Sequence, residues 1–284
     1  MINTKNKVIT VAILFAIVIL SASFGLFRED KGVVSPNIET VGEMERTTLG
    51  GVSSRMPDNS TKILFESLLG VKLQNYHSYQ DVFETLSALR SNEIQAAWFP
   101  DVTVNYLLQM EKGLKEVPTP DSEQPRLEFA MAVKPDRTQL LDELNSALAS
   151  LKKDGKLQEL QEYYVTNASA AAKYTPSDME EIIDSNQTLY VGVTGAVWPI
   201  DLVDIELEPY GFSVALMNEI GKLLHKDVQF VTLRNDTAFS SLMGGKVDLL
   251  FCYGTSKSTL TDQKNYIMTD GYYSMYKYSY LVLE

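Results

Sequence analysis

Two stretches of this sequence place polar groups where a folded chain could hold a small ligand. The first is the pair Pro100 and Asp101, which comes directly after the apolar run Ile94–Phe99. This run predicts a buried strand, and open α/β sheets bind their ligands outside the carboxyl ends of such strands. Asp101 is therefore a candidate ligand-contacting residue.

The second stretch is a turn rich in small residues. The run Leu49–Val52 predicts a short strand with a glycine pair, and it leads into Ser53 and Ser54. Residue types that cap helices follow at 58–60, and apolar residues then recur at helical spacing as far as Leu69. A strand end that opens onto a helix leaves backbone N–H groups free to hold an anion. The alternative is an ordinary turn between a strand and a helix.

The elements that must position these residues alternate between strand and helix. From Thr188 to Phe251 the chain reads as a strand, an amphipathic helix, a second strand, a second helix and a third strand. Such alternation builds a parallel sheet covered by helices, so the predicted class is α/β. The remaining elements are expected as strands at Val71–Tyr76, Ile94–Phe99, Leu114–Val117, Arg126–Val133 and Tyr278–Leu283, and helices at Tyr79–Leu89, Val102–Met110 and Leu140–Leu151.

Composition excludes several classes of function. The chain has 284 residues, of which 45% are hydrophobic and 22% charged, as in ordinary globular proteins. The net charge of -12, without a stripe of Lys and Arg, excludes a nucleic-acid partner. The single cysteine, Cys252, permits no internal disulfide, and we expect it to be a buried structural thiol. With only His77 and His225 besides, a Cys/His metal site is not supported.

Nothing in the sequence points to catalysis. Neither histidine belongs to a recognisable serine and aspartate arrangement, and the chain has no Gly-rich phosphate loop. We therefore expect a protein that is not an enzyme and that needs no cofactor.

The N-terminus carries a membrane or export signal. Lys5 and Lys7 precede the uncharged apolar run Val8–Leu20, and weaker apolar character continues to residue 27. About twenty helical residues span about 30 Å, enough to cross a bilayer core. Residues 1–28 are therefore predicted to be a transmembrane anchor with the rest of the chain outside the cytoplasm. The alternative is a cleaved signal, for which residues 21–23 offer a site. No cysteine follows the run, so a lipid anchor is not expected.

Two polar stretches divide the rest of the chain. Residues 29–47 have no sustained period and predict a juxtamembrane linker, and residues 166–187 predict a connector. Between and after them lie two α/β halves, 48–165 and 188–284.

The later half resembles a known family. The segments TLYVGV, GFSVALMNEI, GKVD and TDGYY are similar to the first lobe of the bacterial extracellular solute-binding proteins of the polar amino-acid type. The matching residues include Gly211, Phe212, Lys246, Asp248 and Tyr273. Gly271 stands where that family usually has proline.

The earlier half is similar to the second lobe of the same family. Tyr76, Ser78, Asp81 and Asp101 fit its pattern, and the run LNSALASLKKDGKL from Leu144 fits its return helix. The two lobes thus come in the reverse of the usual order. The resemblance implies a two-lobe periplasmic-binding-protein type II clamshell, circularly permuted into a single domain. The competing interpretation is two incomplete halves of a tandem array.

The resemblance also implies a ligand site between the lobes. Family members hold the ammonium of an amino acid on an acidic residue, and Asp101 fits that position. They hold the carboxylate on a helix N-terminus and an arginine; Ser53 and Ser54 fit the first loosely, and Lys264 stands in place of the arginine. Lysine keeps the charge but loses the planar two-pronged contact. The remaining candidates line the cleft or, alternatively, pack in the core: Trp98, Trp198, Tyr253, Thr255, Tyr272 and Tyr273.

The expected function follows from this resemblance. We expect a membrane-anchored, extracytoplasmic domain that captures a small polar ligand for an ABC transporter or as the sensor of a signalling protein. Its partners would be the ligand, the membrane and either a permease or a signalling protein. The alternative is a degenerate module that binds no small molecule and acts through protein contacts.

Overall fold

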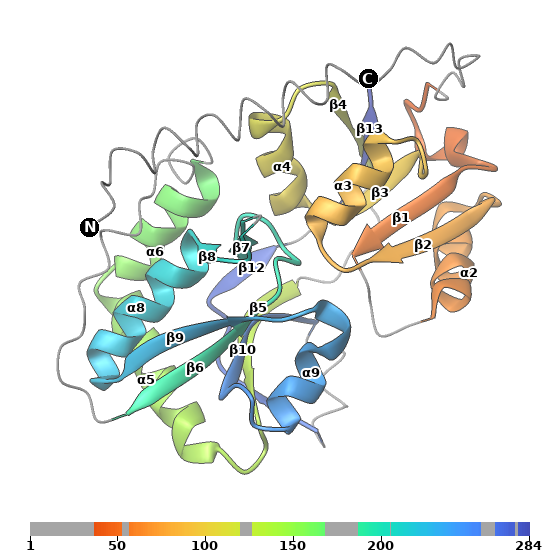
Figure 1. The fold of residues 1–284 in the computed structure, drawn as a ribbon. Coiled ribbons are helices and arrows are strands. Elements are labelled where there is room, and N and C mark those ends of the chain that lie inside the picture. Colours follow the sequence, from red (N-terminus) through yellow and green to blue (C-terminus); the bar gives the residue numbers. More distant parts are fainter. Residues whose placement is uncertain are drawn as a thin grey trace, which may run out of the picture. The chain divides into compact units, whose positions relative to one another are not determined.

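The first sheet, which we call sheet A, has five strands. In the computed structural model, which describes residues 37–52, 57–119, 127–167, 187–204, 206–256, 265–275 and 278–284, their order is β2-β1-β3-β13-β4 (Figure 1). β1 pairs in parallel with β2 and β3, and β13 runs antiparallel between β3 and β4. The bounds are β1 Thr48–Val52, β2 Asn75–Tyr79, β3 Ala96–Pro100, β4 Leu114–Pro118 and β13 Tyr278–Leu283.

Helices cover both faces of sheet A because β3 alternates. Ala96 and Trp98 point to one face, where Phe65 of α2 is buried, whereas Ala97 and Phe99 point to the other face, toward α3. We call this sheet with its helices lobe A. The helices are η1 Val41–Met44, α2 Asp58–Leu69, α3 Val82–Arg90 and α4 Asp101–Met110.

The second sheet, sheet B, contributes strands to the largest hydrophobic cluster of the described residues. Its order is β11-β5-β10-β6-β9, with β12 also paired to β5. β6 pairs in parallel with β9 and β10, and β5 runs antiparallel to β10. The strands are β5 Leu127–Val133, β6 Thr188–Val193, β9 Asp227–Thr232, β10 Leu249–Ser256, β11 Ile267–Met268 and β12 Tyr273–Met275, and a small hairpin pairs β7 Leu202–Val203 with β8 Pro209–Tyr210.

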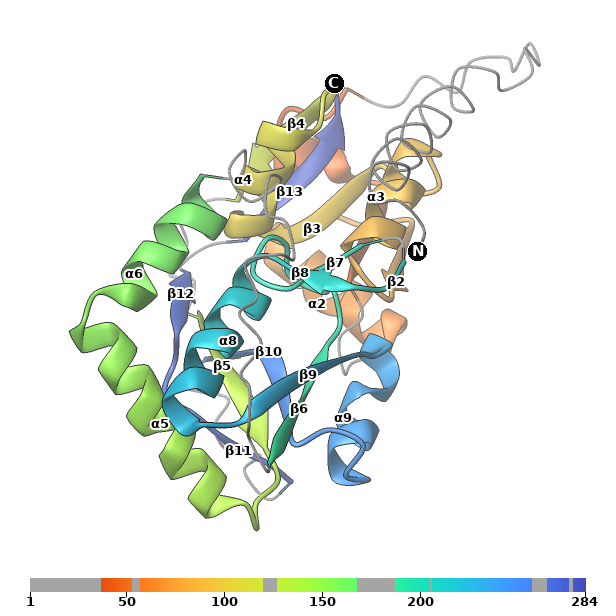
Figure 2. The ribbon, with the colours of Figure 1, turned by 60° about the vertical axis from the view of Figure 1, so that its left-hand side comes forward.

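Helices lie on both faces of sheet B as well (Figure 2). α5, α6 and α8 share one large buried cluster with β5, β6 and β10, and α9 packs on the other face through Leu242 and Ala238. We call this sheet with its helices lobe B. The helices are α5 Thr138–Lys153, α6 Lys156–Gln161, the π-turn η2 Glu162–Thr166, α8 Phe212–Leu224 and α9 Asn235–Met243.

Each sheet takes a strand from the other half of the chain. β5 belongs to the earlier half by sequence but pairs with β10 in sheet B, and β13 from the later half lies between β3 and β4 in sheet A. The predicted return helix, α5, also packs against lobe B. Neither half of the chain therefore contains all the strands of one sheet, and the predicted α/β class is confirmed.

Two predicted elements are displaced along the chain. The strand expected at Val71–Tyr76 is instead Asn75–Tyr79. Val71 and Leu73 belong to the loop after α2, and they are apolar because they pack into the cluster of Phe65. The helix expected from Tyr79 begins at Val82, because the Asp81 carboxylate caps it by accepting the Glu84 N–H at 2.8 Å.

Part of the expected linker, residues 29–47, packs against sheet A. Ile38 and Met44 are buried against sheet A, so residues 37–47 of the expected linker belong to the fold. Residues 1–28, the predicted anchor, lie outside the described part of the chain. Within the described part no helix is long and apolar enough to span a bilayer.

Candidate functional site at the facing strand ends

The carboxyl ends of the parallel strands in the two lobes face each other. Gln80, which follows β2, donates from its amide to Asp236 Oδ2 at 3.2 Å and accepts the Asp236 N–H at 3.3 Å. Asp236 lies at the start of α9, which follows β9. The N–H of Val82 reaches the carbonyl of Gly195, which follows β6, at 3.5 Å. Because ligands of open α/β sheets bind beyond these strand ends, this is the candidate site.

A second contact between the lobes joins α4 to the loop after β6. Thr103, which is fully buried, donates from its hydroxyl to the Trp198 carbonyl at 2.7 Å. The rings of Tyr106 and Trp198 meet edge to face with centroids 6.1 Å apart. Val102 and Ile200 belong to the same buried cluster. Trp198 is therefore packed on lobe A, which agrees with the structural-packing alternative for this residue.

The contact between Thr103 and Trp198 can be tested by substitution. Thr103→Val keeps the shape of the side chain but removes the donor, so we expect the free energy of unfolding to fall by about 1–2 kcal/mol. Urea unfolding measures this, with the exposed Thr138→Val as the matched control. Equal midpoints for the two variants would show that the hydrogen bond adds nothing.

A buried carboxylate, that of Asp201, binds the backbone at the start of the loop from Thr194 to Ile200. Asp201 has no exposed surface, and its Oδ2 accepts the N–H groups of Thr194 and Gly195 at 2.9 and 3.0 Å and the Thr194 hydroxyl at 3.1 Å. Its Oδ1 is buried without a hydrogen-bond partner among the described residues. Burial raises the pKa of this carboxyl, against the opposing effect of the N–H donors. Asp201 was not predicted as a site residue, although it interrupts the apolar run WPIDLV.

Asp101 lies where the strand pattern predicted it. It is the first residue of α4, directly after β3, and it is half-buried. Its Oδ1 accepts the N–H of Val102 at 2.7 Å. Across the lobes its charge reaches Tyr273 of β12, where burial and then the Asp101 charge raise the pKa of the hydroxyl. Asp101 is thus a carboxylate at the facing ends that could bind a cationic group.

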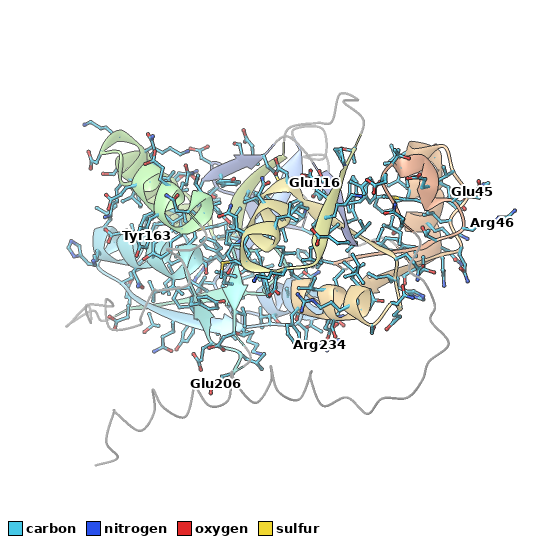
Figure 3. The ribbon with its side chains drawn as sticks, turned by 90° about the horizontal axis from the view of Figure 1, so that it is seen from above. Glu45, Arg46, Glu116, Tyr163, Glu206 and Arg234 are labelled. Carbon is cyan, nitrogen blue, oxygen red and sulfur yellow. The ribbon has the colours of Figure 1, made fainter. Side chains whose placement is uncertain are left out.

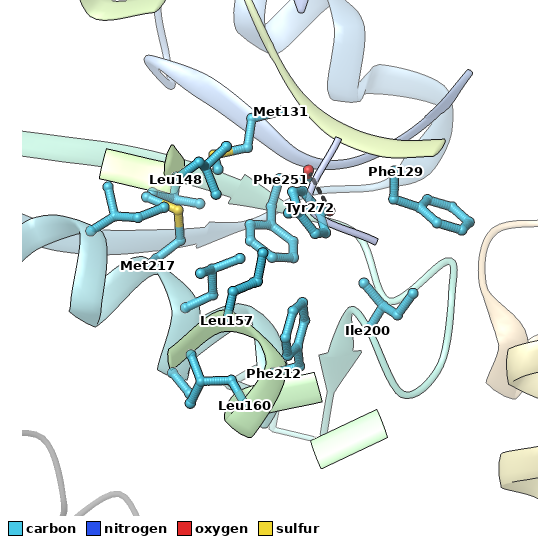
Figure 4. Close-up of a cluster of buried hydrophobic side chains, with 14 of the residues drawn as sticks. Phe129, Met131, Leu148, Leu157, Leu160, Ile200, Phe212, Met217, Phe251 and Tyr272 are labelled. Atoms are coloured by element: carbon cyan, nitrogen blue, oxygen red, sulfur yellow. Dashed lines mark hydrogen bonds between the residues drawn. The ribbon is translucent and has the colours of Figure 1, made fainter. Parts of the chain in front are cut away.

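Tyr272, for which the sequence left cleft lining and core packing as alternatives, lies in the core of lobe B. It is 1% exposed, stacks on Phe251 with centroids 4.9 Å apart, and donates its hydroxyl to the Phe251 carbonyl at 2.9 Å (Figure 4). Tyr273, the next residue, is partly buried against the same cluster, and the Asp101 charge adds to burial in raising the pKa of its hydroxyl.

The glycine turn before α2 has a structural explanation. A Cβ on Gly50 would lie 2.5 Å from Ile94 Cδ1, and one on Gly51 would lie 2.9 Å from the Tyr76 hydroxyl. The N-cap of α2 is Pro57, not one of the capping types at 58–60, and it makes no side-chain cap bond. The Asp58 carboxylate already stands at this helix start and accepts the Ser78 hydroxyl at 2.7 Å. A second anion here would meet that charge.

Several predicted site residues fall outside what the structure describes. These are Ser53, Ser54 and Lys264, which follow β1 and β10, together with the side chains of Tyr253 and Thr255. The backbones of Tyr253 and Thr255 pair with β5. Trp98 lies in the aromatic cluster under α2, stacked on Tyr278 at 4.9 Å. Among the residues the structure covers, no group of His, Cys, Asp and Glu is arranged to hold a metal ion.

Solved structures give distant similarities. The ancestral amino acid-binding protein AncCDT-1, a precursor of cyclohexadienyl dehydratase, has 10% identity, with 84% of this chain and 82% of that chain covered and a TM-score of 0.44. The zinc-bound ligand-binding component of an ABC-type import system from Staphylococcus aureus has 9% identity and a TM-score of 0.43. The match covers 84% of this chain and 66% of that chain. The GluR0 ligand-binding core with L-glutamate has 10% identity and a TM-score of 0.40. The match covers 84% of this chain and 84% of that chain.

Sequence comparison is more specific for the later half. No curated protein matches the chain. A family model does match residues 189–283, a range that runs from β6 to β13 and covers about a third of the chain. It includes the strand ends after β6 and β9, with Gly195 and Asp236. The matching model is that of the bacterial extracellular solute-binding proteins, family 3, so residues 189–283 are similar to that family.

Proposed function

We propose that this protein is an extracytoplasmic solute-binding domain that closes over a small polar, amino-acid-like ligand between lobes A and B. The observation that carries the proposal is the facing of two sets of strand ends, β2 and β3 in lobe A and β6 and β9 in lobe B. Sites between two such elements are where small ligands bind in α/β proteins. The family match of residues 189–283 supports the same function.

We further propose that the chain is one circularly permuted domain. The strand exchange of β5 and β13 supports this, because each sheet is completed only by a strand from the other half. A permutation joins termini that lie near each other, which folded domains usually tolerate. In the competing interpretation, two incomplete halves of a tandem array, β3 and β4 would need another partner.

The proposed ligand contacts divide by charge. Asp101, the first residue of α4 after β3, would bind the ammonium group of the ligand. The carboxylate would be bound by Lys264, which follows β10, because the Asp58 carboxylate already stands at the start of α2. A lysine offers one point charge where a guanidinium offers a fork, so we expect weaker discrimination for an α-carboxylate than an arginine would give.

Residues 1–28 complete the proposal as a membrane anchor. The uncharged run Val8–Leu20 behind Lys5 and Lys7 supports this part. The domain would then deliver its ligand to a permease or report ligand capture to a signalling partner. A cleaved signal would give the same domain in secreted form.

One observation favours the alternative of a module that binds no small molecule. The buried contact between Thr103 and Trp198 already joins the lobes by apolar packing, with Ile200 and Val102 in one cluster. Lobes held together in this way could act through protein contacts alone.

A thermal-shift screen decides between the two functions. The chain is heated with amino acids, amines and small acids, and a ligand at a hundred times its dissociation constant should add about 2.7 kcal/mol to the stability. Asp101→Asn should abolish the shift given by an amine-bearing ligand, whereas the exposed Asp136→Asn should leave it unchanged.

Either of two results would count against the proposal. If no compound shifts the melting temperature, the interaction module is the better description. If Asp101→Asn responds like the parent chain, Asp101 does not contact the ligand.

A further inference from the structure

The loop after β6 and the hairpin β7–β8 form a single element that packs on both lobes. It runs from Thr194 to Tyr210, between the end of β6 and Gly211, the N-cap of α8. Both ends of this stretch therefore join lobe B. The hairpin itself lies between α8 and the strands of sheet A (Figures 1 and 2). We call the described residues of this stretch, 194–204 and 206–210, the wedge.

One face of the hairpin packs on lobe A. Leu202 has no exposed surface, and among the described residues the other buried members of its hydrophobic cluster belong to lobe A, such as Leu86 of α3 and Leu107 of α4. Tyr210 stands directly opposite Leu202 in the hairpin and packs against the same cluster. Because residues that are directly opposite in an antiparallel pair share a face, these two side chains form one surface directed at lobe A.

The other face of the wedge packs on lobe B. Val203, the next residue of β7, packs against the large cluster that α5, α6 and α8 share, and so does Val197 in the loop. Ile200 is fully buried in that cluster. Neighbouring residues of a strand point to opposite faces, which explains why Leu202 and Val203 reach different lobes. The wedge is therefore packed between the two lobes.

Polar contacts fix the shape of the wedge and join it to lobe A. The Asp201 N–H donates to the Val197 carbonyl at 2.8 Å, and Asp201 Oδ2 accepts the Gly195 N–H at 3.0 Å. One residue thus closes the loop from both sides. Trp198 lies within this loop, and its carbonyl accepts the hydroxyl of Thr103 from lobe A at 2.7 Å. The chain itself therefore holds the loop in the shape that contacts lobe A.

The tip of the hairpin differs from its base. Glu206 lies at the surface of the domain (Figure 3), and Leu207 is 66% exposed. The turn is fixed locally, since Asp204 Oδ1 accepts the Glu206 N–H at 2.8 Å. Only the base of the hairpin is therefore inserted between the lobes.

Separation of the lobes on this side would expose apolar surface to water. Leu202 and Tyr210 would lose their packing, and so would the ring of Trp198, which meets Tyr106 edge to face. Exposure of such groups to water is unfavourable. A ligand shifts a conformational equilibrium only by its different affinity for the two states, and on the wedge side the packing already favours the joined state.

We propose that the wedge keeps lobe A docked on lobe B before any solute binds, so that the domain is already closed on the side of α4. The inference rests on the proposed function, because the site that it concerns lies between the same two lobes. It adds the regulation of that site: a solute changes the gap on the opposite side and does not bring together two separated lobes.

The distance between two spin labels tests this inference without any solute. In the full chain with Cys252→Ser, the labels are attached at the exposed positions Asn105→Cys of α4 and Glu159→Cys of α6. The chain is purified in urea, which removes solutes of the expression host, and refolded in detergent until it melts like the directly purified chain. We expect pulsed dipolar spectroscopy to give one narrow distance, with a separated form in at most about 10% of molecules.

Two neighbouring substitutions test whether the wedge is the cause. Leu202→Asn places a polar group against lobe A, whereas Val203→Asn places the same group on the face toward lobe B. We expect the first variant to raise the separated form at least about tenfold, because its amide is buried without a partner, and the second to leave the distance unchanged. If Leu202→Asn does not fold, Thr103→Val replaces it, and we expect a change in the same direction.

Two results would overturn the inference. A broad or long distance in the refolded parent chain would show that the lobes separate without a solute. Equal distances in Val203→Asn and in the folded variant that weakens the contact with lobe A would show that the wedge does not hold the lobes together.

The same measurements separate this inference from the proposed function. If the parent chain is open and closes when an amino acid that gives a thermal shift is added, the proposed function stands and the wedge inference fails. One narrow distance, together with no thermal shift from any compound, would support the wedge and contradict the proposed ligand.

Discussion

Replacing Leu281 with alanine is expected to lower the free energy of unfolding by about 2–5 kcal/mol. Leu281 lies in β13, has no exposed surface, and packs in the cluster formed by α3 and α4 on sheet A. Leu281 has this packing because β13 lies between β3 and β4, so the alanine variant is destabilised only in this arrangement. Urea unfolding followed by circular dichroism measures the change.

A matched leucine makes this experiment specific for the strand exchange. Leu223 of α8 is 45% exposed, so Leu223→Ala should change the stability by less than about 1 kcal/mol. Similar effects at the two positions would contradict the placement of β13 in sheet A, and with it the permuted arrangement.

Asp201→Ala is the second substitution with a large expected effect. It leaves the N–H groups of Thr194 and Gly195 buried without their acceptor, and each unsatisfied group costs about 1–3 kcal/mol. We therefore expect a loss of about 2–5 kcal/mol at neutral pH, measured by thermal or urea unfolding. Asp201→Asn keeps one acceptor oxygen and should cost much less than the alanine variant.

The pH dependence of stability distinguishes the effect of the Asp201 charge from the effect of the shape of its side chain. Burial raises the pKa of Asp201 in the folded chain, so the neutral carboxyl is the form that folding favours. The contribution of Asp201 to the free energy of unfolding is fully present below the pKa of this side chain in the unfolded chain, about 3.9. It is lost as the pH rises through the pKa in the folded chain. Asp201→Asn removes this loss, so its stability relative to the parent should rise as pH increases above about 4. A difference that is flat with pH would contradict the raised pKa.

The sequence predicted those elements whose signal is local. The alternation from β6 to β10 and the strand at Tyr278–Leu283 match the structure, because burial of one face imposes periods of two and 3.6 residues that can be read directly. The boundaries of β2 and α3 were less accurate, since the cap at Asp81 and the loop packing of Leu73 depend on neighbouring elements.

The candidate site was harder to predict than the fold. The position of Asp101 at the end of β3 could be predicted because a strand end is visible in the sequence. Tyr272 and Tyr273 look alike in sequence, and only the pairing of β12 with β5 decides which of them is buried. Asp201 and the pair of Gln80 with Asp236 depend on contacts between segments distant in the chain, for which a single sequence gives no signal.

The two bridges between the lobes differ in kind, and this difference sets a direction for motion. Gln80 and Asp236 meet through exposed polar groups that water can replace, whereas Thr103, Trp198 and Tyr106 meet in a part-buried contact between packed side chains. We expect the first to separate easily and the second to persist. Opening would then be a swing about a pivot at α4, with its widest gap between the ends of β2 and β9, and that side is where a solute would enter.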